Sequence, residues 1–520
     1  MAETYYVTTP IYYVNDVPHI GHSYTTIAAD VLARYHRAEG RDVFFLTGTD
    51  EHGIKIVKAA AERGVSPKAL ADEVVVHFEQ LWQELNISHD DFIRTSEPRH
   101  ERRVREIIRR LVERGEIYPG RYEGWCDEGQ EEFVTAFAAR ENAFKSAITG
   151  RPLVRYSEPS YFFRLSKWVP RLVEHIQATP SFILPGPRRN EVLSKLARGV
   201  EDLSISRPLE KLDNWGVPMP NDPAHSVYVW IDALSNYYTA LGCPEVGDDH
   251  DAKGARYWPA DVHLIGKDIL WFHAVYWPCM LMALDLPLPR CIFAHGWWTS
   301  EGKKMSKSLG NFVSRRTIAD ICREFSPDVY RYFLLRQVPF GADGDFSHQM
   351  LVQRYNTELA NGIGNLLHRT VSMIERYFDG SIPSPGDAAA GDGAGVRAAA
   401  ADLVQSTPAA MAACQLHVPL EKLLAVTTQT NRYIDSTEPF KLARDPSQRD
   451  RLATVLYTCA EALRVILLYL RPFMPESAER GLAQLGWQVP PGRLAELGRW
   501  GLLPKGLRTN KSEALFPRKT

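Results

Sequence analysis

The two histidines of the tetrapeptide His19–His22 (His-Ile-Gly-His) constrain the fold of this chain more than any other feature. The run Tyr5–Thr9 before them is β-branched and aromatic and is followed by a proline, a pattern typical of a buried strand. After them, apolar residues recur at helical spacing as far as Gly40, which predicts a helix. The imidazoles are therefore expected where a strand of an α/β sheet passes into a helix, a position that favours anions.

The tetrapeptide has the chemistry of a nucleotide site. His19 and His22 can each donate a hydrogen bond to a phosphate oxygen. Gly21 lets a flat base or a phosphate approach the backbone closely. Two surface histidines at the start of a helix are the alternative interpretation, and these four residues alone do not decide between the two.

A second run, Lys303–Ser308, follows another predicted strand, Cys291–Gly296, and is bracketed by glycines, so a loop that can move is expected. Lysines on such a loop can close over a triphosphate and neutralise charge that develops at the α-phosphorus. A solvated lysine run is the alternative. With both runs in this order, the chain resembles the class I aminoacyl-tRNA synthetases, whose HIGH and KMSKS motifs correspond to His19–His22 and Lys304–Ser308.

Length and composition indicate a large cytoplasmic protein. The chain has 520 residues, of which 45% are apolar, so several domains with substantial cores are expected. Its formal charge of −2 gives no overall signal for nucleic-acid binding. Seven cysteines without paired spacing are typical of a reduced cytosolic protein. Because neither a secretory signal nor an apolar run of about 20 residues is recognised, we expect no membrane partner.

The resemblance implies an α/β fold class, with a Rossmann-like catalytic domain whose parallel sheet is split by an insertion and followed by an all-α helix bundle. The expected segments are the first catalytic half (1–117), the connective-peptide insertion (118–223), the second catalytic half (224–300), the KMSKS loop with a stem-contact linking region (301–352) and the helical anticodon-binding domain (353–520). The insertion is too short for the editing domain of the isoleucine, valine and leucine enzymes. Helices are predicted over Ser66–Glu113, Thr357–Tyr377, Leu403–Asp435 and Leu452–Leu470.

A methionine site is implied by resemblance to the methionyl-tRNA synthetase group. Trp230, Ala233 and Tyr237 share one face of a predicted helix, although a core stripe would look the same. Asp50, at the end of the predicted strand Asp42–Asp50, would hold the substrate amino group, although it could also cap a helix. A thioether is apolar and polarisable and favours aromatic neighbours. By resemblance, the methionine side chain would be lined by Ile11, Tyr13, Trp230, Ala233, Tyr237, Ile269 and His273.

The zinc knuckle that this family often carries in the insertion is predicted to be lost. Cys126 is retained, but Gly129 stands where the next ligand is expected. Ser146 and Thr149 stand in place of the second cysteine pair. Because one cysteine cannot build a tetrahedral zinc site, we expect no structural zinc and no other metal site.

The helical domain would carry the specificity for tRNA, beside the specificity of the catalytic domain for the amino acid. Asn365 and Arg369 are four residues apart, so their side chains project side by side and could bond the edges of unstacked bases. Phe440, in Glu438–Phe440, stands where the family usually has a stacking tryptophan; it offers a smaller ring and no N–H donor. By resemblance these three residues bind the anticodon. An ordinary solvated helix face is the alternative for Asn365 and Arg369.

The resemblance implies an enzyme that attaches methionine to its initiator and elongator tRNAs with ATP, in two steps through methionyl-adenylate. Its catalytic residues would be His19, His22, Lys304 and Lys307, with Gly21 as a further ATP contact and Mg²⁺ accompanying the nucleotide. A related class I specificity, a small-molecule nucleotidylyltransferase and a non-catalytic tRNA-binding relative are the alternatives. The sequence ends at Thr520 without the dimerising domain of some relatives, so a monomer is expected.

Overall fold

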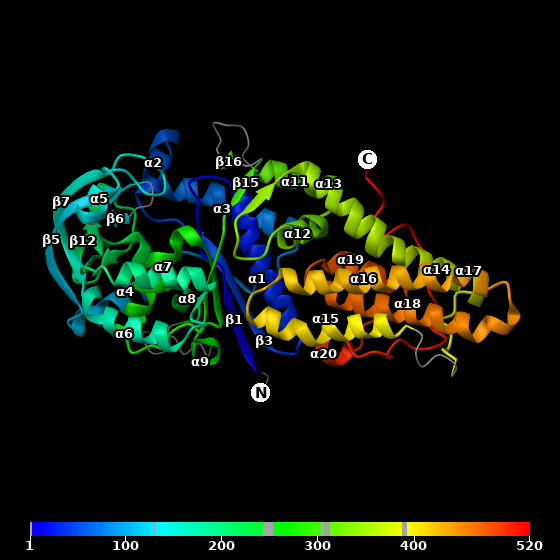
Figure 1. Ribbon diagram of the computed structural model, residues 1–520. Helices are drawn as coiled ribbons and strands as arrows, with labels where there is room; N and C mark the ends of the chain where they lie inside the picture. Colours follow the sequence, from blue (N-terminus) through cyan, green and yellow to red (C-terminus); the bar gives the residue numbers. More distant parts are fainter. Residues whose placement is uncertain are drawn as a thin grey trace. The chain divides into compact units, whose positions relative to one another are not determined.

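The computed structural model describes residues 3–128, 132–134, 136–242, 253–300, 303–304, 313–386 and 393–519. The chain divides into two compact units, each visible as a group of elements in Figure 1. The first, here called the sheet unit, holds Glu3–Ala29 and Val43–Trp297. The second, the helical unit, holds Asp30–Asp42 and Trp298–Thr520.

A seven-stranded sheet forms the centre of the sheet unit. Its strand order is β2-β3-β1-β13-β14-β8, with β4 also paired to β3. The pairs β1·β13, β13·β14, β14·β8, β2·β3 and β3·β4 are all parallel, as expected for a Rossmann-like sheet. The strands are β1 (Thr4–Thr8), β2 (Tyr12–Tyr13), β3 (Asp42–Asp50), β4 (Asp91–Arg94), β8 (Ile183–Leu184), β13 (Val262–Gly266) and β14 (Ile292–His295).

The central strands read as continuous apolar runs because helices cover the sheet. Tyr6 and Val7 on β1 and Phe45 and Leu46 on β3 are fully buried. The predicted strand Asp42–Asp50 coincides with β3. Outside residues 118–223, the α-helices of this part of the chain are α1 (Ile20–Ala38), α2 (Ile54–Arg63), α3 (Pro67–Glu84), α4 (Pro98–Glu113), α8 (Val229–Thr239), α9 (Lys253–Tyr257) and α10 (Trp277–Ala283).

The region 66–113 differs from its prediction as one helical stretch. The short strand β4 separates α3 from α4 and pairs with β3 from Leu46↔Asp91 to Thr49↔Arg94. Four residues between two helices carry too little periodicity to predict a strand, and the pairing with β3 decides their conformation.

The region predicted as an insertion, 118–223, begins with a long antiparallel ribbon. Strands β5 (Ile117–Asp127) and β7 (Val154–Phe163) pair over ten residues, from Ile117↔Phe163 to Cys126↔Val154. The ribbon is followed by α6 (Leu165–Ala178) and α7 (Gly186–Leu196), and β8 between them joins the main sheet beside β14. The smaller strands of this region are β6 (Glu132–Val134), β9 (Leu203–Ser204), β10 (Ser206–Pro208), β11 (Pro218–Met219) and β12 (Asp222–Val227).

The helical unit is built from long helices that pack on one another, as Figure 1 shows for α14, α15, α16 and α18. The predicted helix over 403–435 is wrong in one respect: it is two helices, α15 and α16, separated by a turn in which Cys414 adopts a φ of 53°. The helices are α11 (Arg315–Glu324), α12 (Pro327–Arg336), α13 (His348–Arg354), η5 (Tyr355–Gly364), α14 (Asn365–Phe378), α15 (Ala394–Ala412), α16 (His417–Thr437), α17 (Pro439–Leu442), α18 (Arg449–Leu470), α19 (Pro475–Gln484) and α20 (Leu494–Leu497).

One helix of this unit is an exception to the expectation that no apolar run is long enough to span a membrane. The stretch Pro446–Leu470 is long and apolar enough to cross a membrane by length and composition alone. Its most apolar window is entirely buried among the other helices, as in the core helix of a bundle. Such a helix is weak evidence for a membrane span.

Candidate active site

The histidine tetrapeptide lies at the start of α1, as predicted. His19 directly precedes the helix, and its ring stacks on that of His22 with centroids 3.8 Å apart. The backbone N–H of His19 donates to Nδ1 of His22 at 3.2 Å, and the N–H of Gly21 donates to Nδ1 of His19 at 3.1 Å. In the neutral rings the proton is therefore on Nε2, the atom that can donate to a phosphate oxygen.

Burial decides the charge of these rings. It lowers the pKa of His19 to about 4, although the carboxylate of Asp268 acts in the opposite direction. Burial also holds the pKa of His22 well below its usual value, and His19 lowers it further. Both rings are therefore neutral near pH 7 and supply directed hydrogen bonds rather than positive charge. A Cβ on Gly21 would lie 3.0 Å from Cε1 of His19, so glycine permits this ring position.

The predicted lysines are only partly described. Lys303 and Lys304 form the short strand β16, which pairs antiparallel with β15 (Trp298–Ser300) in the helical unit. β15 also pairs with β17 (Gly344–Phe346). Lys307 and the other residues from Met305 to Ser308 lie outside the described residues.

The end of β3 brings two of the predicted methionine-binding residues together. Tyr13 on β2 is the register partner of Asp50, the last residue of β3, and Asp50 is buried. Ile11 and Tyr13 are partly buried and pack against the same apolar core as Trp230. The ring of Tyr13 meets that of Trp230 edge-on with centroids 6.3 Å apart.

An aromatic cluster surrounds the helix α8, where Trp230, Ala233 and Tyr237 are all buried. Trp230 stacks on Phe272 with ring centroids 3.7 Å apart and planes within 5°. Phe272 was not predicted, although it is the neighbour of the predicted residue His273. These contacts bring the predicted residues of α8 together with those of the segment 269–273.

The polar atoms of this cluster satisfy one another. Nδ1 of His273 lies 3.0 Å from the carbonyl oxygen of Ile269, so it carries the proton. Nε2 of His273 then accepts a hydrogen bond from the Tyr237 hydroxyl at 2.7 Å. Burial lowers the pKa of His273 to about 4 and raises that of Tyr237. The cluster is therefore uncharged near neutral pH, which suits an apolar, polarisable side chain.

The residues at the positions where the family's zinc ligands are expected form ordinary hydrogen bonds. Arg207 donates to Sγ of the buried Cys126 at 3.0 Å. The Ser146 hydroxyl accepts hydrogen bonds from the backbone N–H groups of Ile148 and Thr149, at 3.2 and 2.9 Å, and so stabilises the turn between Ser146 and Thr149. In the described part of the chain, no three His, Cys, Asp or Glu side chains group as they would around a metal ion. Gly129 is outside that part.

The predicted anticodon residues lie in the helical unit. Asn365 is exposed at the first position of α14, and Arg369 follows one turn later on the same helix. Arg369 forms an ion pair of 2.9 Å with Asp435 near the end of α16. Three residues beyond Asp435 the chain turns at Glu438, with a φ of 46°, into α17, where Phe440 is 46% exposed.

Comparison with known proteins covers both units. The family model "tRNA synthetases class I (M)" matches residues 5–140 and 138–371. The methionine–tRNA ligase of Caldanaerobacter subterraneus is 47% identical over 518 residues, which are 100% of this chain and 79% of that protein. The methionine–tRNA ligase of Rickettsia felis is 45% identical over 521 residues, which are 100% of this chain and 99% of that protein.

A solved structure agrees with this result. Mycobacterium tuberculosis methionyl-tRNA synthetase in complex with methionyl-adenylate superposes with a TM-score of 0.92 at 42% identity, over 99% of this chain and 100% of that one. The likeness extends through the parallel sheet and the helical region and confirms the predicted α/β fold class. The chain belongs to the methionyl-tRNA synthetase family of class I aminoacyl-tRNA synthetases.

Proposed function

We propose that this protein activates methionine with ATP and attaches it to tRNA through a methionyl-adenylate intermediate. The observation that carries the proposal is the whole-length similarity to methionine–tRNA ligases, which includes a relative solved with methionyl-adenylate. The uncharged aromatic cluster around Trp230, Tyr237 and His273 supports methionine as the amino acid.

In the first step, the methionine carboxylate attacks the α-phosphorus of ATP, and pyrophosphate leaves. No side chain has to act as a nucleophile; catalysis comes from holding the substrates in line and stabilising the charge that moves to pyrophosphate. His19 and His22 would donate from Nε2, with Gly21 beside the nucleotide. Lys304 and Lys307 would supply positive charge, and Mg²⁺ would enter as the MgATP complex.

The amino acid would be held at both ends. Asp50 would accept the ammonium group, and the side chain would lie among aromatic and apolar residues. The residues assigned to that pocket are Ile11, Tyr13, Trp230, Ala233, Tyr237, Ile269 and His273. Its aromatic rings would remove the thioether from water.

In the second step, the terminal ribose hydroxyl of the tRNA takes the methionyl group. Asn365 and Arg369 would bond base edges of the anticodon, and Phe440 would stack on a base. The exposed positions of Asn365 and Phe440 support this assignment, since unstacked bases can reach them. The initiator and elongator methionine tRNAs would share this surface.

We further propose a cytoplasmic monomer without structural zinc. The hydrogen bonds of Cys126 and Ser146 support the absence of zinc, because they give both side chains partners other than a metal. Elemental analysis of protein purified without chelator should find well below one zinc per chain. A stoichiometric value would contradict this part of the proposal, and light scattering across a concentration series tests the monomer.

Methionine-dependent ATP–pyrophosphate exchange tests the activity. The purified protein should support exchange with methionine far better than with any other standard amino acid. Better exchange with another amino acid would indicate a related class I specificity. Exchange that does not depend on any added amino acid would indicate a nucleotidylyltransferase. The absence of all exchange would indicate a non-catalytic relative.

A further inference from the structure

The carboxylate of Asp232 lies between two histidines inside the sheet unit. Its Oδ2 is 2.7 Å from Nδ1 of His52, and its Oδ1 is 2.8 Å from Nε2 of His100. The three residues are between 0 and 2% exposed. They come from three elements: His52 follows β3, His100 belongs to α4, and Asp232 belongs to the first turn of α8.

Asp232 occupies a special place on α8. It lies between Trp230 and Ala233, two residues of the proposed methionine pocket. Its partner His52 lies two residues after Asp50, the proposed ligand of the substrate ammonium group. The Asp232–His52 hydrogen bond therefore connects the two ends of the proposed amino-acid site. The two bonded residues are 180 positions apart in the sequence.

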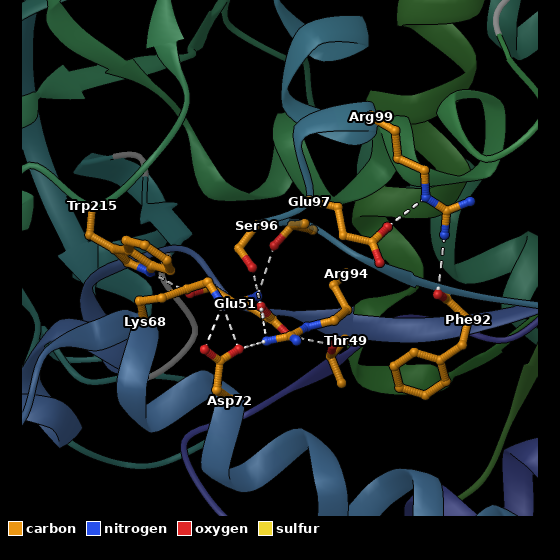
Figure 2. Close-up of polar contacts among 11 residues, drawn as sticks. Thr49, Glu51, Lys68, Asp72, Phe92, Arg94, Ser96, Glu97, Arg99 and Trp215 are labelled. Carbon is orange, nitrogen blue, oxygen red and sulfur yellow. Dashed lines mark hydrogen bonds and ion pairs between the residues drawn. The ribbon is translucent and has the colours of Figure 1, made fainter.

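The residue between Asp50 and His52 is anchored as well. Figure 2 shows the buried carboxylate of Glu51 held by Arg94, whose Nε and Nη2 donate at 2.6 and 3.0 Å, and by the hydroxyls of Thr49 and Ser96. The indole of Trp215 donates to the backbone oxygen of Glu51 at 2.5 Å. Glu51 is thus fixed to β4, and His52 to α8, so the backbone that follows Asp50 has little freedom.

The charges that face His52 come from every neighbouring element. Asp232 on α8, Glu101 on α4 at 3.7 Å and Asp50 on β3 are acidic. Arg207, on β10, is basic and shares with His52 the lining of a cavity of about 20 Å³, room for roughly one water molecule. Burial alone would lower the pKa of His52, but the carboxylates raise it to about 10.

The pKa of Asp232 moves in the opposite direction. Burial would raise it, but the two imidazoles outweigh burial and lower it to about 2. His52 and Asp232 therefore remain an ion pair without net charge throughout the neutral range. The Asp50 carboxylate is left to hold the substrate ammonium without an unbalanced positive charge beside it.

We propose that Asp232 is a positioning residue for methionine: it holds His52, and with it the segment that carries Asp50, against the helix of the methionine pocket, and it balances the charge of His52. The inference rests on the proposed function, since it assigns Asp50 and α8 to the amino-acid site. Asp232 itself touches no substrate in this scheme.

The proposal makes a signed prediction about pH. In Asp232→Asn, His52 loses its counter-charge, and its pKa should fall towards the ordinary value of about 6.5. Above that value His52 would be neutral, as would the amide introduced by the substitution, and the charge balance would resemble that of the parent. Below it His52 would carry an unbalanced positive charge beside Asp50 and would oppose the substrate ammonium.

The test is ATP–pyrophosphate exchange by the full-length protein, measured between pH 6 and 8.5. For Asp232→Asn we expect KM for methionine to rise about tenfold at pH 8, which is about 1.4 kcal/mol, while kcat and KM for ATP stay within about twofold. The ratio of variant to parent KM should rise further, about threefold, as the pH falls from 8 to 6. Asp232→Glu keeps the charge, so its KM ratio should not change with pH.

Thr239→Val is the matched control for the alternative that Asp232 only stabilises the packing of α8 and has no effect on methionine binding. The Thr239 hydroxyl lies 2.7 Å from Nδ1 of His100 and also links α8 to α4, but its bond is to the histidine and not to the carboxylate of Asp232. This variant should lose thermal stability without a change in KM for methionine. If Asp232→Asn lowered Tm like Thr239→Val and left KM and its pH dependence unchanged, Asp232 would be only a clamp and the inference would be wrong.

The controls also separate this inference from the proposed function. Absence of methionine-dependent exchange in the parent protein would overturn the proposed function, and the inference with it. Exchange by the parent together with unchanged KM values in folded Asp232→Asn would overturn the inference alone. Folding of each variant is checked by near-ultraviolet circular dichroism.

Discussion

The proposed methionine site and the proposed anticodon surface fix their side chains in opposite ways. In the sheet unit, Tyr237 and His273 are buried and bonded to each other, and Trp230 is stacked on Phe272. In the helical unit, Asn365 is exposed and Phe440 is 46% exposed. The apolar side chain of a small substrate has to be taken out of water by a surface formed beforehand. Unstacked bases instead bring polar edges and large ring faces to a surface that can stay open.

The difference indicates that the two specificities should fail separately. A change in the buried cluster removes contacts and leaves a cavity, so it should affect amino-acid activation even without tRNA. A change on the exposed helices should leave the fold and the first step intact, because surface substitutions usually alter stability little. Pyrophosphate exchange and tRNA charging, measured side by side, separate the two kinds of failure.

Lys307→Ala should have the largest effect, because it acts on the activation of methionine, which must occur before any tRNA is charged. Losing one oriented electrostatic donor typically costs about 10²–10³ in rate, and the charge on the KMSKS run matters most as pyrophosphate leaves. We expect kcat for exchange to fall by that factor with little change in the Kd of methionine. Lys303→Ala, in the same lysine run, is the control. A kcat within about threefold of the parent would contradict the catalytic role of Lys307.

Trp230→Ala should disable the buried site alone. Removing a buried aromatic side chain forfeits about 2–3 kcal/mol of apolar burial, which corresponds to roughly 30- to 150-fold in kcat/KM for methionine. Exchange without tRNA should show the whole loss. Trp168→Ala is the matched control, because Trp168 lies on α6 and bonds Glu116 outside the pocket. Equal losses in both variants would mean that Trp230 supports only the fold.

Arg369→Ala should disable the exposed surface alone. Hydrogen bonds to charged groups contribute about 1.5–3 kcal/mol, so charging of methionine tRNA should fall by roughly 10- to 150-fold while exchange remains near the parent value. Arg376→Ala is the control, since Arg376 lies two turns further on the same helix and stacks on Tyr377. A tRNA with a replaced anticodon should be charged poorly by parent and variant alike. Parental charging by Arg369→Ala would identify this face as an ordinary solvated one.

The same contrast explains what the sequence could predict. Elements predicted from one uninterrupted run of residues agree with the structure. β3 has the predicted bounds, and His19–His22 lies at the start of α1, as the strand-to-helix pattern predicts. The family assignment from two short motifs is confirmed by the comparisons. Asp232 looked like one residue in an aromatic stripe, because its partners His52 and His100 lie 180 and 132 residues away.

Short elements were missed for a related physical reason. β4 and β8 are strands of four and two residues whose conformation depends on their pairing with β3 and β14. The break at Cys414 was also missed, although Pro419 in the first turn of α16 is a typical helix-start signal. Propensity is a weak guide wherever tertiary pairing decides the outcome.

Substitutions at Phe440 should have the smallest effects, and they test the exposed surface most directly. Stacking of a base on an aromatic side chain is worth about 1–3 kcal/mol by alanine substitution, and phenylalanine offers less ring area than the tryptophan usual in the family. Phe440→Ala should therefore lower charging of methionine tRNA by about fivefold, near the bottom of that range. Tyr377→Ala is a control for loss of an aromatic ring, because Tyr377 is a partly exposed residue of a different helix, α14.

Phe440→Trp should act in the opposite direction. A larger ring with an N–H donor should raise kcat/KM for tRNA by about two- to threefold and leave exchange unchanged, because no buried contact is altered. The side chain is open enough to accept the larger ring without displacing core residues. If Phe440→Ala and Phe440→Trp both charged tRNA like the parent, Phe440 would not stack on the anticodon, and the exposed surface would depend on Asn365 and Arg369 alone. An effect of Phe440→Trp on exchange would instead mean that the anticodon surface and the methionine site are coupled. That result would contradict the prediction that the two sites fail separately.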